Sequence, residues 1–272
     1  MDSSRTLKEP TRIIKLDGPV NFRDLSGYRG MHGRSTPWRT LFRSDGLDSL
    51  TAADCAILED HIGLGVVIDL RTEDEVNAVG SAQGTLRSAE YHHLPIMDQT
   101  KHMLISVHAG RTMAELYVEM AANSGTYVAQ TVRVIAQSRG PAVFHCAAGK
   151  DRTGLIAAVV LDLLGVSDQD ITADYALSAA ILPILRARWD LRMNEVGQAG
   201  DNPGVGTQNS ATTGWTSNDW DRAGTAMLSA RVSTIETLVH TLRTDHGSIE
   251  GWLRAQGLTS ADLAMFRNRL LG

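Results

Sequence analysis

The chain has few of the residues on which several classes of protein depend. It holds only two cysteines among 272 residues, Cys55 and Cys146, so it cannot build the disulfide framework of a small secreted protein. No stretch approaches the ~18 consecutive apolar residues of a membrane-spanning helix, and residues 1–10 lack the apolar core of a signal peptide. Aromatic residues make up only 5% of the chain, so we expect a mostly aliphatic core. These absences predict no integral membrane segment and make the cytoplasm the default location.

Positive charge is not in excess either. The 26 lysine and arginine residues stand against 31 acidic residues, and the net charge of −5 argues against a general nucleic-acid-binding protein. It does not argue against a phosphate ligand, because local backbone dipoles outweigh a diffuse surface charge. A hydrophobic content of 43% supports a sizeable core. Since we find no internal repeat and no linker, we predict a single domain over residues 1–272.

Short apolar runs alternate with helical patterns along much of the chain. The apolar runs predict strands at 66–70, 91–94 and 142–144, and short edge strands at 13–16 and 40–43. Capping residues and helical periodicity predict helices at 51–61, from 72, at 111–122, 125–138, 155–164, 167–180, 184–196 and within 225–271. This alternation favours an α/β fold with a mainly parallel central sheet flanked by helices on both faces. A functional site is then expected at the carboxyl ends of the strands.

The segment from Val143 to Gly154 carries the strongest functional signal. It reads Val-Phe-His-Cys-Ala-Ala-Gly-Lys-Asp-Arg-Thr-Gly and joins a predicted buried strand to a predicted helix. Such a turn directs several backbone N–H groups and a helix N-terminus at one point, which creates an anion site. The guanidinium of Arg152 can hold two phosphate oxygens, and Cys146 would lie beneath the phosphorus in a field that favours the thiolate. A thiolate in that position is a nucleophile for phosphoryl transfer.

This segment fits a nucleotide-binding loop or a chance match less well. A loop of the Walker type is excluded, because Lys150 is followed by Asp151 rather than by serine or threonine. A chance occurrence of Cys-x5-Arg-Thr would leave Cys146 as a small buried hydrophobe and Arg152 as a surface residue. The accompanying His, Gly, Lys, Asp and Gly make that coincidence improbable.

The loop resembles that of the cysteine-dependent protein tyrosine phosphatases, in which Cys-x5-Arg-Thr follows a histidine. The longer run His-Cys-x-Ala-Gly-Lys-Asp-Arg-Thr-Gly is similar to the bacterial branch of tyrosine-phosphatase-like proteins and to related phosphoinositide phosphatases. Further segments resemble the same branch, at 21–25, 41–44, 69–72, 93–95, 173–175 and 252–271. The resemblance spans residues 19–272, is weak over 97–113 and 197–224, and implies a cysteine-phosphatase-like fold.

The resemblance implies a metal-independent phosphomonoester hydrolase without a cofactor. Cys146 would form a cysteinyl-phosphate, and Arg152 would clamp the phosphate. The remaining loop residues expected to bind substrate are Ala147, Ala148, Gly149, Lys150 and Thr153. Thr153 could also hydrogen-bond the sulfur and help it leave in the second step; it could instead cap the helix, and both roles can hold together. His145 is expected to orient the loop rather than to react.

Three residues, Lys150, Asp151 and Asp98, have alternative interpretations. Lys150 could supply a second cation for a substrate with several phosphates, or could simply face solvent. The leaving alcohol needs a proton from an acid within hydrogen-bond reach. Asp98 lies on a loop after a strand, where relatives in the family carry an acid, whereas Asp151 lies in the catalytic loop itself. We prefer Asp98 as the acid, with Asp151 tuning the loop or replacing it; otherwise Asp98 is a solvated loop residue and Asp151 a partner of Lys150 or Arg152.

Charged residues outside the loop are expected to support it. The segments that resemble the family contain residues expected to form a buried ion-pair scaffold, namely Arg23, Asp24, Arg43, Asp69 and Arg71. Asp69 and Arg71 share one face of a strand and could pair with other members of this set. Cys55 lies in an apolar helical pattern and is expected in the core.

We expect residues 181–224 to form a lid or an insertion. Leu182, Ile184, Leu185 and Trp189 would present an apolar face over the pocket, and the glycine-rich continuation would dock and release. The alternative is a disordered surface insertion.

The expected substrate is a phosphorylated protein or a phosphoinositide. A catalytically weak phospho-binding module is the alternative function. Sulfur transfer and arsenate reduction are less favoured, because proteins with those activities usually lack the Lys-Asp-Arg-Thr-Gly ending and arsenate reduction needs further resolving thiols, for which Cys55 is the only candidate. A family member is exported without an ordinary signal peptide, so the resemblance leaves export open.

Overall fold

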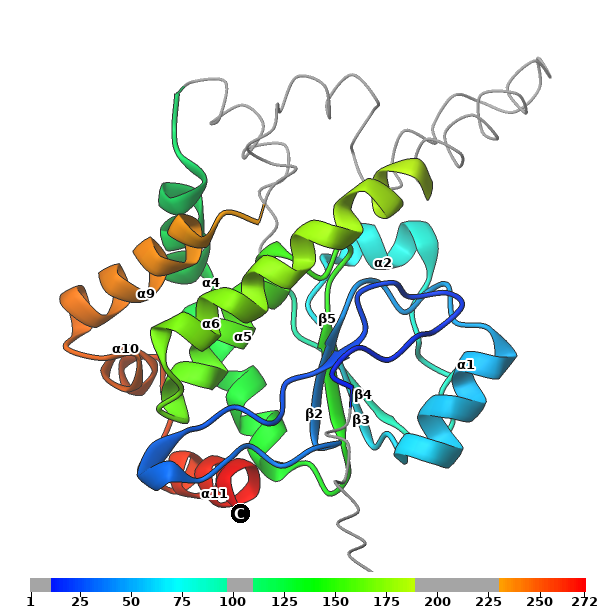
Figure 1. Cartoon of the computed structure of the whole chain (residues 1–272), viewed down its shortest axis with the longest axis horizontal. Coiled ribbons are helices and arrows are strands. Elements are labelled where there is room, and N and C mark those ends of the chain that lie inside the picture. Colours follow the sequence, from blue (N-terminus) through cyan, green and yellow to red (C-terminus); the bar gives the residue numbers. More distant parts are fainter. Residues whose placement is uncertain (1–10, 97–109, 189–229) are drawn as a thin grey trace, which may run out of the picture.

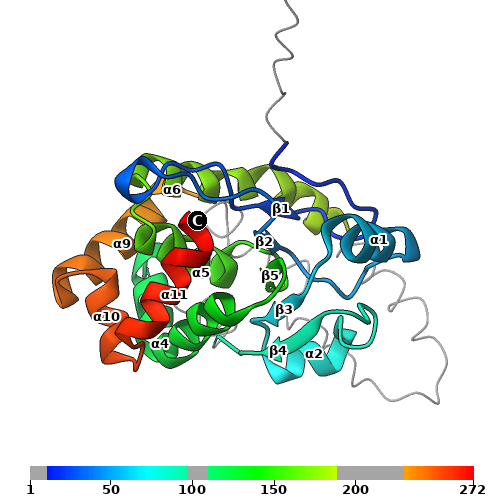
Figure 2. The ribbon, with the colours of Figure 1, turned by 90° about the horizontal axis from the view of Figure 1, so that it is seen from below.

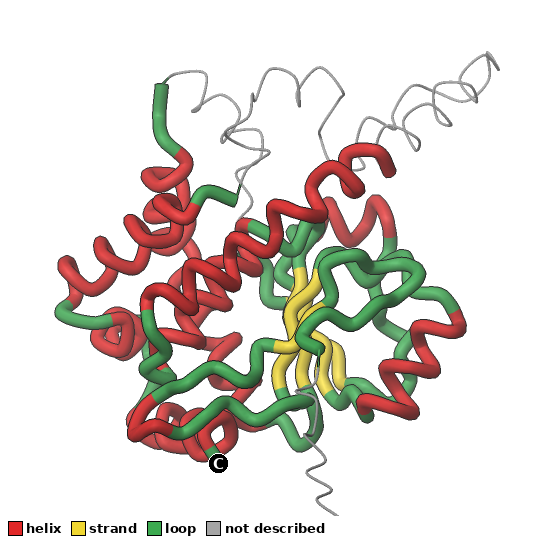
Figure 3. The backbone as a smooth tube through the Cα atoms, viewed as in Figure 1, coloured by secondary structure: helices red, strands yellow, loops and turns green. Residues whose placement is uncertain are grey.

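A five-stranded sheet lies at the centre of the computed structural model, which describes residues 11–96, 110–188 and 230–272 (Figures 1 and 3). The strands run in the order β1-β2-β5-β3-β4 across the sheet. Their bounds are β1 Arg23–Asp24, β2 Leu41–Ser44, β3 Val66–Asp69, β4 Glu90–His93 and β5 Ala142–His145. Only β1 is antiparallel to its neighbour, while β2, β5, β3 and β4 run parallel. The expected mainly parallel sheet is therefore confirmed.

Helices cover both faces of this sheet, as predicted, but unequally (Figure 2). One face carries a thick layer that consists of α4 Met113–Gln137, α5 Asp151–Leu163, α6 Asp168–Ala176, α9 Val232–His246, α10 Ile249–Ala255 and α11 Ser260–Leu271. The other face carries α1 Ala52–Ala56, its π-helical continuation η2 Ile57–Ile62, and α2 Glu73–Val79. None of the helices in the described ranges is long and apolar enough to cross a membrane.

Alternating side chains of the strands supply two separate apolar clusters. Ile68 and Phe144 belong to the cluster beneath the thick helical layer, whereas their neighbours Val67 and Val143 belong to the cluster beneath α1. This division follows from the two-residue period of a strand. Nearly every residue of α5 is buried, which fits a helix that is apolar all round and packed on several sides. The helix that follows the candidate loop is thus held firmly in the core.

Several predicted capping residues occupy the expected places. Thr51, Thr72 and Thr259 each form a capping box with the acidic residue three positions on, and Ser167 caps α6. After α6 the chain continues as the 3₁₀ helix η3 Leu177–Ile181 and stays helical through 182–188. These caps begin the helices where the sequence predicted them to begin.

Three predictions about elements are wrong. The run at 40–43 is not an edge strand, because β2 pairs with β1 on one side and with β5 on the other. The run at 13–16 forms only a single bridge, between Ile13 and Arg23. The two helices predicted at 111–122 and 125–138 are one helix, α4. Gly125 does not end it; a Cβ atom there would lie 2.6 Å from the side chain of Gln256, so this glycine permits close packing.

Most of the predicted lid lies outside the described residues, including Trp189 and 197–224. Within the described part, Leu182 and Leu185 are buried, whereas Ile184 is 46% exposed. Ile184 therefore does not share the apolar face predicted for it with Leu182 and Leu185. Successive side chains of a helix differ by about 100° in direction, so neighbouring residues lie on different sides of the helix. Cys55, predicted in the core, is half-buried against the cluster beneath α1.

Candidate active site

The loop after β5 lies at the carboxyl end of the middle strand of the sheet. His145 ends β5, Cys146 follows it with 2% exposure, and α5 begins at Asp151. Gly149 has a φ of +66°, and a Cβ atom there would lie 2.6 Å from backbone atoms of Ser44 and Asp45. Only glycine fits without strain at such a position. The loop thus turns tightly against the end of β2.

Thr153 lies in the first turn of α5 and points back to the cysteine. Its hydroxyl donates a hydrogen bond to Sγ of Cys146 over 3.1 Å. The alternative role of Thr153 as helix N-cap is wrong, because the N-cap position is occupied by Lys150. A donor at the sulfur is the contact that a thiolate would use.

Arg152 is held by a carboxylate from the other side of the sheet. Its Nη1 and Nη2 atoms lie 2.5 and 2.8 Å from the two carboxylate oxygens of Glu75 in α2, which is a bidentate pair. Burial acts to raise the pKa of Glu75, but the charge of Arg152 and its hydrogen bonds prevail, and this pKa is lowered. Glu75 was not singled out in the sequence as a site residue. Its link to Arg152 is long-range and leaves no local signal.

Lys150 and Asp151 are paired with each other. Lys150 is only 3% exposed, so the solvent-facing alternative for it is wrong. Its Nζ atom lies 3.2 Å from Oδ1 of Asp151, which bears out one of the alternatives for that aspartate. The same Oδ1 accepts a hydrogen bond from the hydroxyl of Tyr117 over 2.5 Å. Tyr117, on α4, was not singled out in the sequence.

A buried ionic cluster lies behind the loop. Asp174 of α6 accepts from Nε of Arg23 at 3.0 Å and from Nη1 of Arg43 at 2.5 Å, and both arginines are buried. Burial acts to raise the pKa of Asp174, but the two guanidinium groups lower it to about 2. Burial, together with the charge of Arg23, lowers the pKa of Arg43 to about 10. The predicted buried scaffold is confirmed for these two arginines.

Arg43 of this ionic cluster and the nearby Asn21 also donate hydrogen bonds to the backbone of the loop. Nη2 of Arg43 donates to the carbonyl oxygen of Gly149 at 2.7 Å, and Nδ2 of Asn21 donates to the carbonyls of Ala148 and Gly149 at 3.3 and 3.1 Å. In a trans peptide the N–H points away from the C=O. Donors behind the loop carbonyls therefore favour loop N–H groups that point to the opposite side.

A second scaffold forms at the end of β3. Nη2 of Arg71 lies 2.7 Å from Oδ2 of Asp69, so these two residues pair with each other, whereas the sequence predicted pairs with other members of the set; Nη1 of Arg71 lies 3.2 Å from Oδ1 of Asp48. His145 is fully buried with Nε2 3.6 Å from Asp69, and burial lowers the pKa of this histidine. Asp24 accepts hydrogen bonds from Ser26 and from the backbone of Arg39 rather than joining an ion pair with the other members. Asp98 lies outside the described residues.

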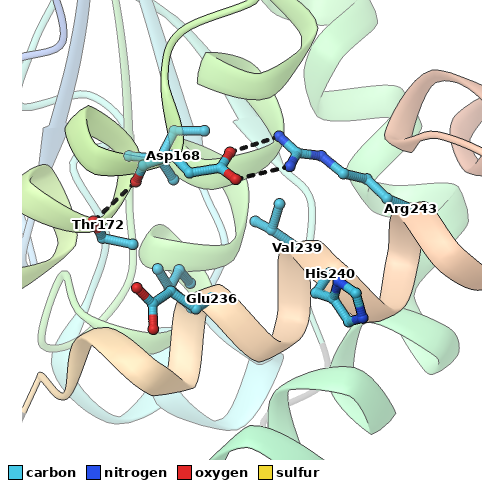
Figure 4. A pocket seen from close by; sticks show the side chains of 8 residues that line it. Asp168, Thr172, Glu236, Val239, His240 and Arg243 are labelled. Carbon is cyan, nitrogen blue, oxygen red and sulfur yellow. Dashed lines mark hydrogen bonds and ion pairs between the residues drawn. The ribbon is translucent and has the colours of Figure 1, made fainter.

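A separate hollow of about 260 Å³ lies between α6 and α9 (Figure 4). Ile171, Ile235 and Val239 supply its apolar lining, and Arg243 pairs with Asp168 at its edge. None of the predicted site residues lines it.

Comparisons with known proteins identify the family of this chain. The sequence profile of the tyrosine phosphatase family matches residues 14–272. A tyrosine-protein phosphatase of Nostoc commune is 31% identical over 90% of this chain and 81% of its own. The triple specificity protein phosphatase PtpB of Mycobacterium tuberculosis is 29% identical over 96% of this chain and 99% of its own. Among solved structures, the Siw14 catalytic core aligns over 60% of this chain and 78% of its own, at 14% identity and a TM-score of 0.35.

The profile covers almost the whole chain and includes both the Cys146 loop and the scaffolds around it. The chain belongs to the tyrosine phosphatase family.

Proposed function

We propose that this protein hydrolyses phosphomonoesters through a cysteinyl-phosphate on Cys146. The observation that carries the proposal is the hydrogen bond from Thr153 to the sulfur, inside a tight loop that also holds Arg152. Sγ attacks the phosphorus while the bond from phosphorus to the leaving oxygen breaks. Water then attacks the phosphorus and gives a proton to the carboxylate that protonated the leaving oxygen, the P–S bond breaks, and the electron pair returns to sulfur, where the Thr153 hydroxyl stabilises it.

Arg152 binds the phosphoryl oxygens in this proposal, and Glu75 orients it. A bidentate carboxylate fixes the plane of the guanidinium, so less rotational freedom is lost when substrate binds. The Arg43 and Asn21 contacts act on the loop itself, because they fix the carbonyls of Ala148 and Gly149. Backbone N–H groups and Arg152 together would stabilise charge on the transferring phosphoryl group.

The leaving oxygen takes its proton from a general acid, for which we propose Asp98. Asp151 is the alternative, since it lies at the start of α5 next to the loop. A positioned acid contributes about 10²–10⁴-fold to such a reaction.

The substrates proposed are phosphotyrosine proteins and, more broadly, phosphoserine or phosphothreonine proteins and phosphoinositides. The triple specificity of the PtpB relative supports a site that accepts more than one kind of phosphomonoester. Lys150 is buried and pairs with Asp151, so a role for it toward a second phosphate would require that phosphate to reach a buried ammonium.

The test is turnover of p-nitrophenyl phosphate by wild type and by Cys146→Ser, with Cys55→Ser as a matched control. We expect no turnover in Cys146→Ser, retained binding of inorganic phosphate, and wild-type activity in Cys55→Ser. Wild-type protein that binds phosphate without turnover would favour the phospho-binding module. Substantial activity in Cys146→Ser would refute the covalent route. Parallel assays on phosphopeptides and phosphoinositides then rank the substrates.

A further inference from the structure

Two buried tyrosines form a hydrogen-bonded chain that ends at the candidate loop. The hydroxyl of Tyr117 lies 2.5 Å from Oδ1 of Asp151 and 2.7 Å from the hydroxyl of Tyr175. A carboxylate can only accept, so Tyr117 donates to Asp151 and accepts from Tyr175. Burial is the main cause that raises the pKa of both tyrosines above 10, the ordinary value. Both tyrosine hydroxyls therefore stay protonated, as these two hydrogen bonds require.

The rings are fixed as firmly as the hydroxyls. Tyr117 and Tyr175 are 0% and 2% exposed, and their rings pack edge to face with centroids 6.1 Å apart. Gly154, in the first turns of α5, leaves room for this arrangement, because a Cβ atom there would lie 2.9 Å from the ring of Tyr175. Rings held in this way present their hydroxyls at a fixed place.

Asp151 by contrast is partly open. Its side chain is 27% exposed, although its Oδ1 atom is bound by Tyr117 and by Lys150. An aspartate at the first position of a helix would otherwise sample several rotamers, and two donors on one oxygen select among them. Such ordering is what a group near a reacting phosphoryl requires.

We infer that Tyr117, supported by Tyr175, is a positioning residue that fixes the Asp151 carboxylate. In the proposed phosphatase reaction Asp151 either tunes the loop or replaces Asp98 as the general acid. This inference rests on the proposed function. It gives α6 two connections to the loop, since Asp174 reaches Gly149 through Arg43, and Tyr175 reaches Asp151 through Tyr117.

The first experiment replaces Tyr117 by phenylalanine, which removes one hydroxyl and keeps the ring. We expect kcat/KM for p-nitrophenyl phosphate to fall about tenfold, the scale of one hydrogen bond to a charged group. The competitive inhibition constant of inorganic phosphate should stay within about twofold, because the phosphate clamp is untouched. Tyr175→Phe should give a smaller loss of the same kind. Tyr127→Phe, at a 39% exposed position on the same helix, should match wild type.

A double-mutant cycle separates positioning from general damage to the core. In an Asp151→Ala background, Tyr117→Phe should cost less than about twofold, because the carboxylate that it positions is gone. The inference is overturned by a full tenfold loss in that background, by a parallel rise of the phosphate inhibition constant, or by wild-type activity in either single variant. If Tyr117→Phe does not fold, the same cycle is run with Tyr175→Phe. Cys146→Ser tests the proposed function independently of these outcomes.

Discussion

Replacement of Asp174 by asparagine should lower the free energy of unfolding by roughly 3–5 kcal/mol, the usual cost of removing one partner from a buried ion pair. The side chain of Asp174 is 1% exposed, and those of its partners Arg23 and Arg43 are 2% and 0% exposed. Asparagine keeps the shape but not the charge, so two guanidinium groups remain in the core without a counterion at this position. By the usual scaling for chains of 150–250 residues, the melting temperature should fall by roughly 6–20 °C.

The assay is urea unfolding followed by circular dichroism, with equal m-values required of wild type and variant. Asp245→Asn, an exposed position at the end of α9, is the matched control and should stay within about 0.5 kcal/mol of wild type. Because the pKa of Asp174 is lowered from 3.8 to about 2, its stabilisation is complete above pH 4 and is lost as the pH falls toward 2. The difference between wild type and Asp174→Asn should therefore shrink over that window. A difference below about 1 kcal/mol at neutral pH would refute the reasoning.

The other predictions concern the candidate active site. Gly149→Ala, which places Cβ 2.6 Å from backbone of a neighbouring strand end, should lower kcat/KM at least about tenfold; wild-type kinetics would contradict the close approach. Glu75→Gln should weaken inhibition by inorganic phosphate, because Arg152 loses its charged partner; an unchanged inhibition constant would remove Glu75 from the site. Asp98→Ala should slow alkyl phosphates about 10²–10⁴-fold more than p-nitrophenyl phosphate. If Asp151→Ala gives that pattern instead, the two roles are exchanged. EDTA should leave activity unchanged, and sensitivity that a metal restores would contradict the mechanism.

Local chemistry explains why much of the fold could be predicted. Capping boxes at Thr51, Thr72 and Thr259 depend on residues three positions apart, and apolar runs such as 66–70 identify buried strands. The order of strands across the sheet is not local, so β2 was wrongly expected at an edge. The continuity of α4 is not local either, because the side chain beside Gly125 is that of Gln256, which follows α10.

The residues of the candidate site also divide into those that could be predicted from the sequence and those that could not. Cys146, Arg152 and Thr153 share one short segment, so the spacing of the sequence brings them together. Glu75 and Tyr117 reach the loop from distant elements, and nothing in their own neighbourhoods marks them. The roles of Asp98 and of the predicted lid stay predictions, as does the single-domain organisation.

The central claim is that Cys146 carries the phosphoryl group during turnover. The most direct measurement mixes enzyme with p-nitrophenyl phosphate, quenches with acid during the first turnovers, and analyses the peptide that contains residue 146 by mass spectrometry. We predict one added phosphoryl group on Cys146 in wild type and none on that peptide in Cys146→Ser. Turnover by wild type without a phosphorylated Cys146 peptide, or with the phosphoryl group on another residue, would contradict the account.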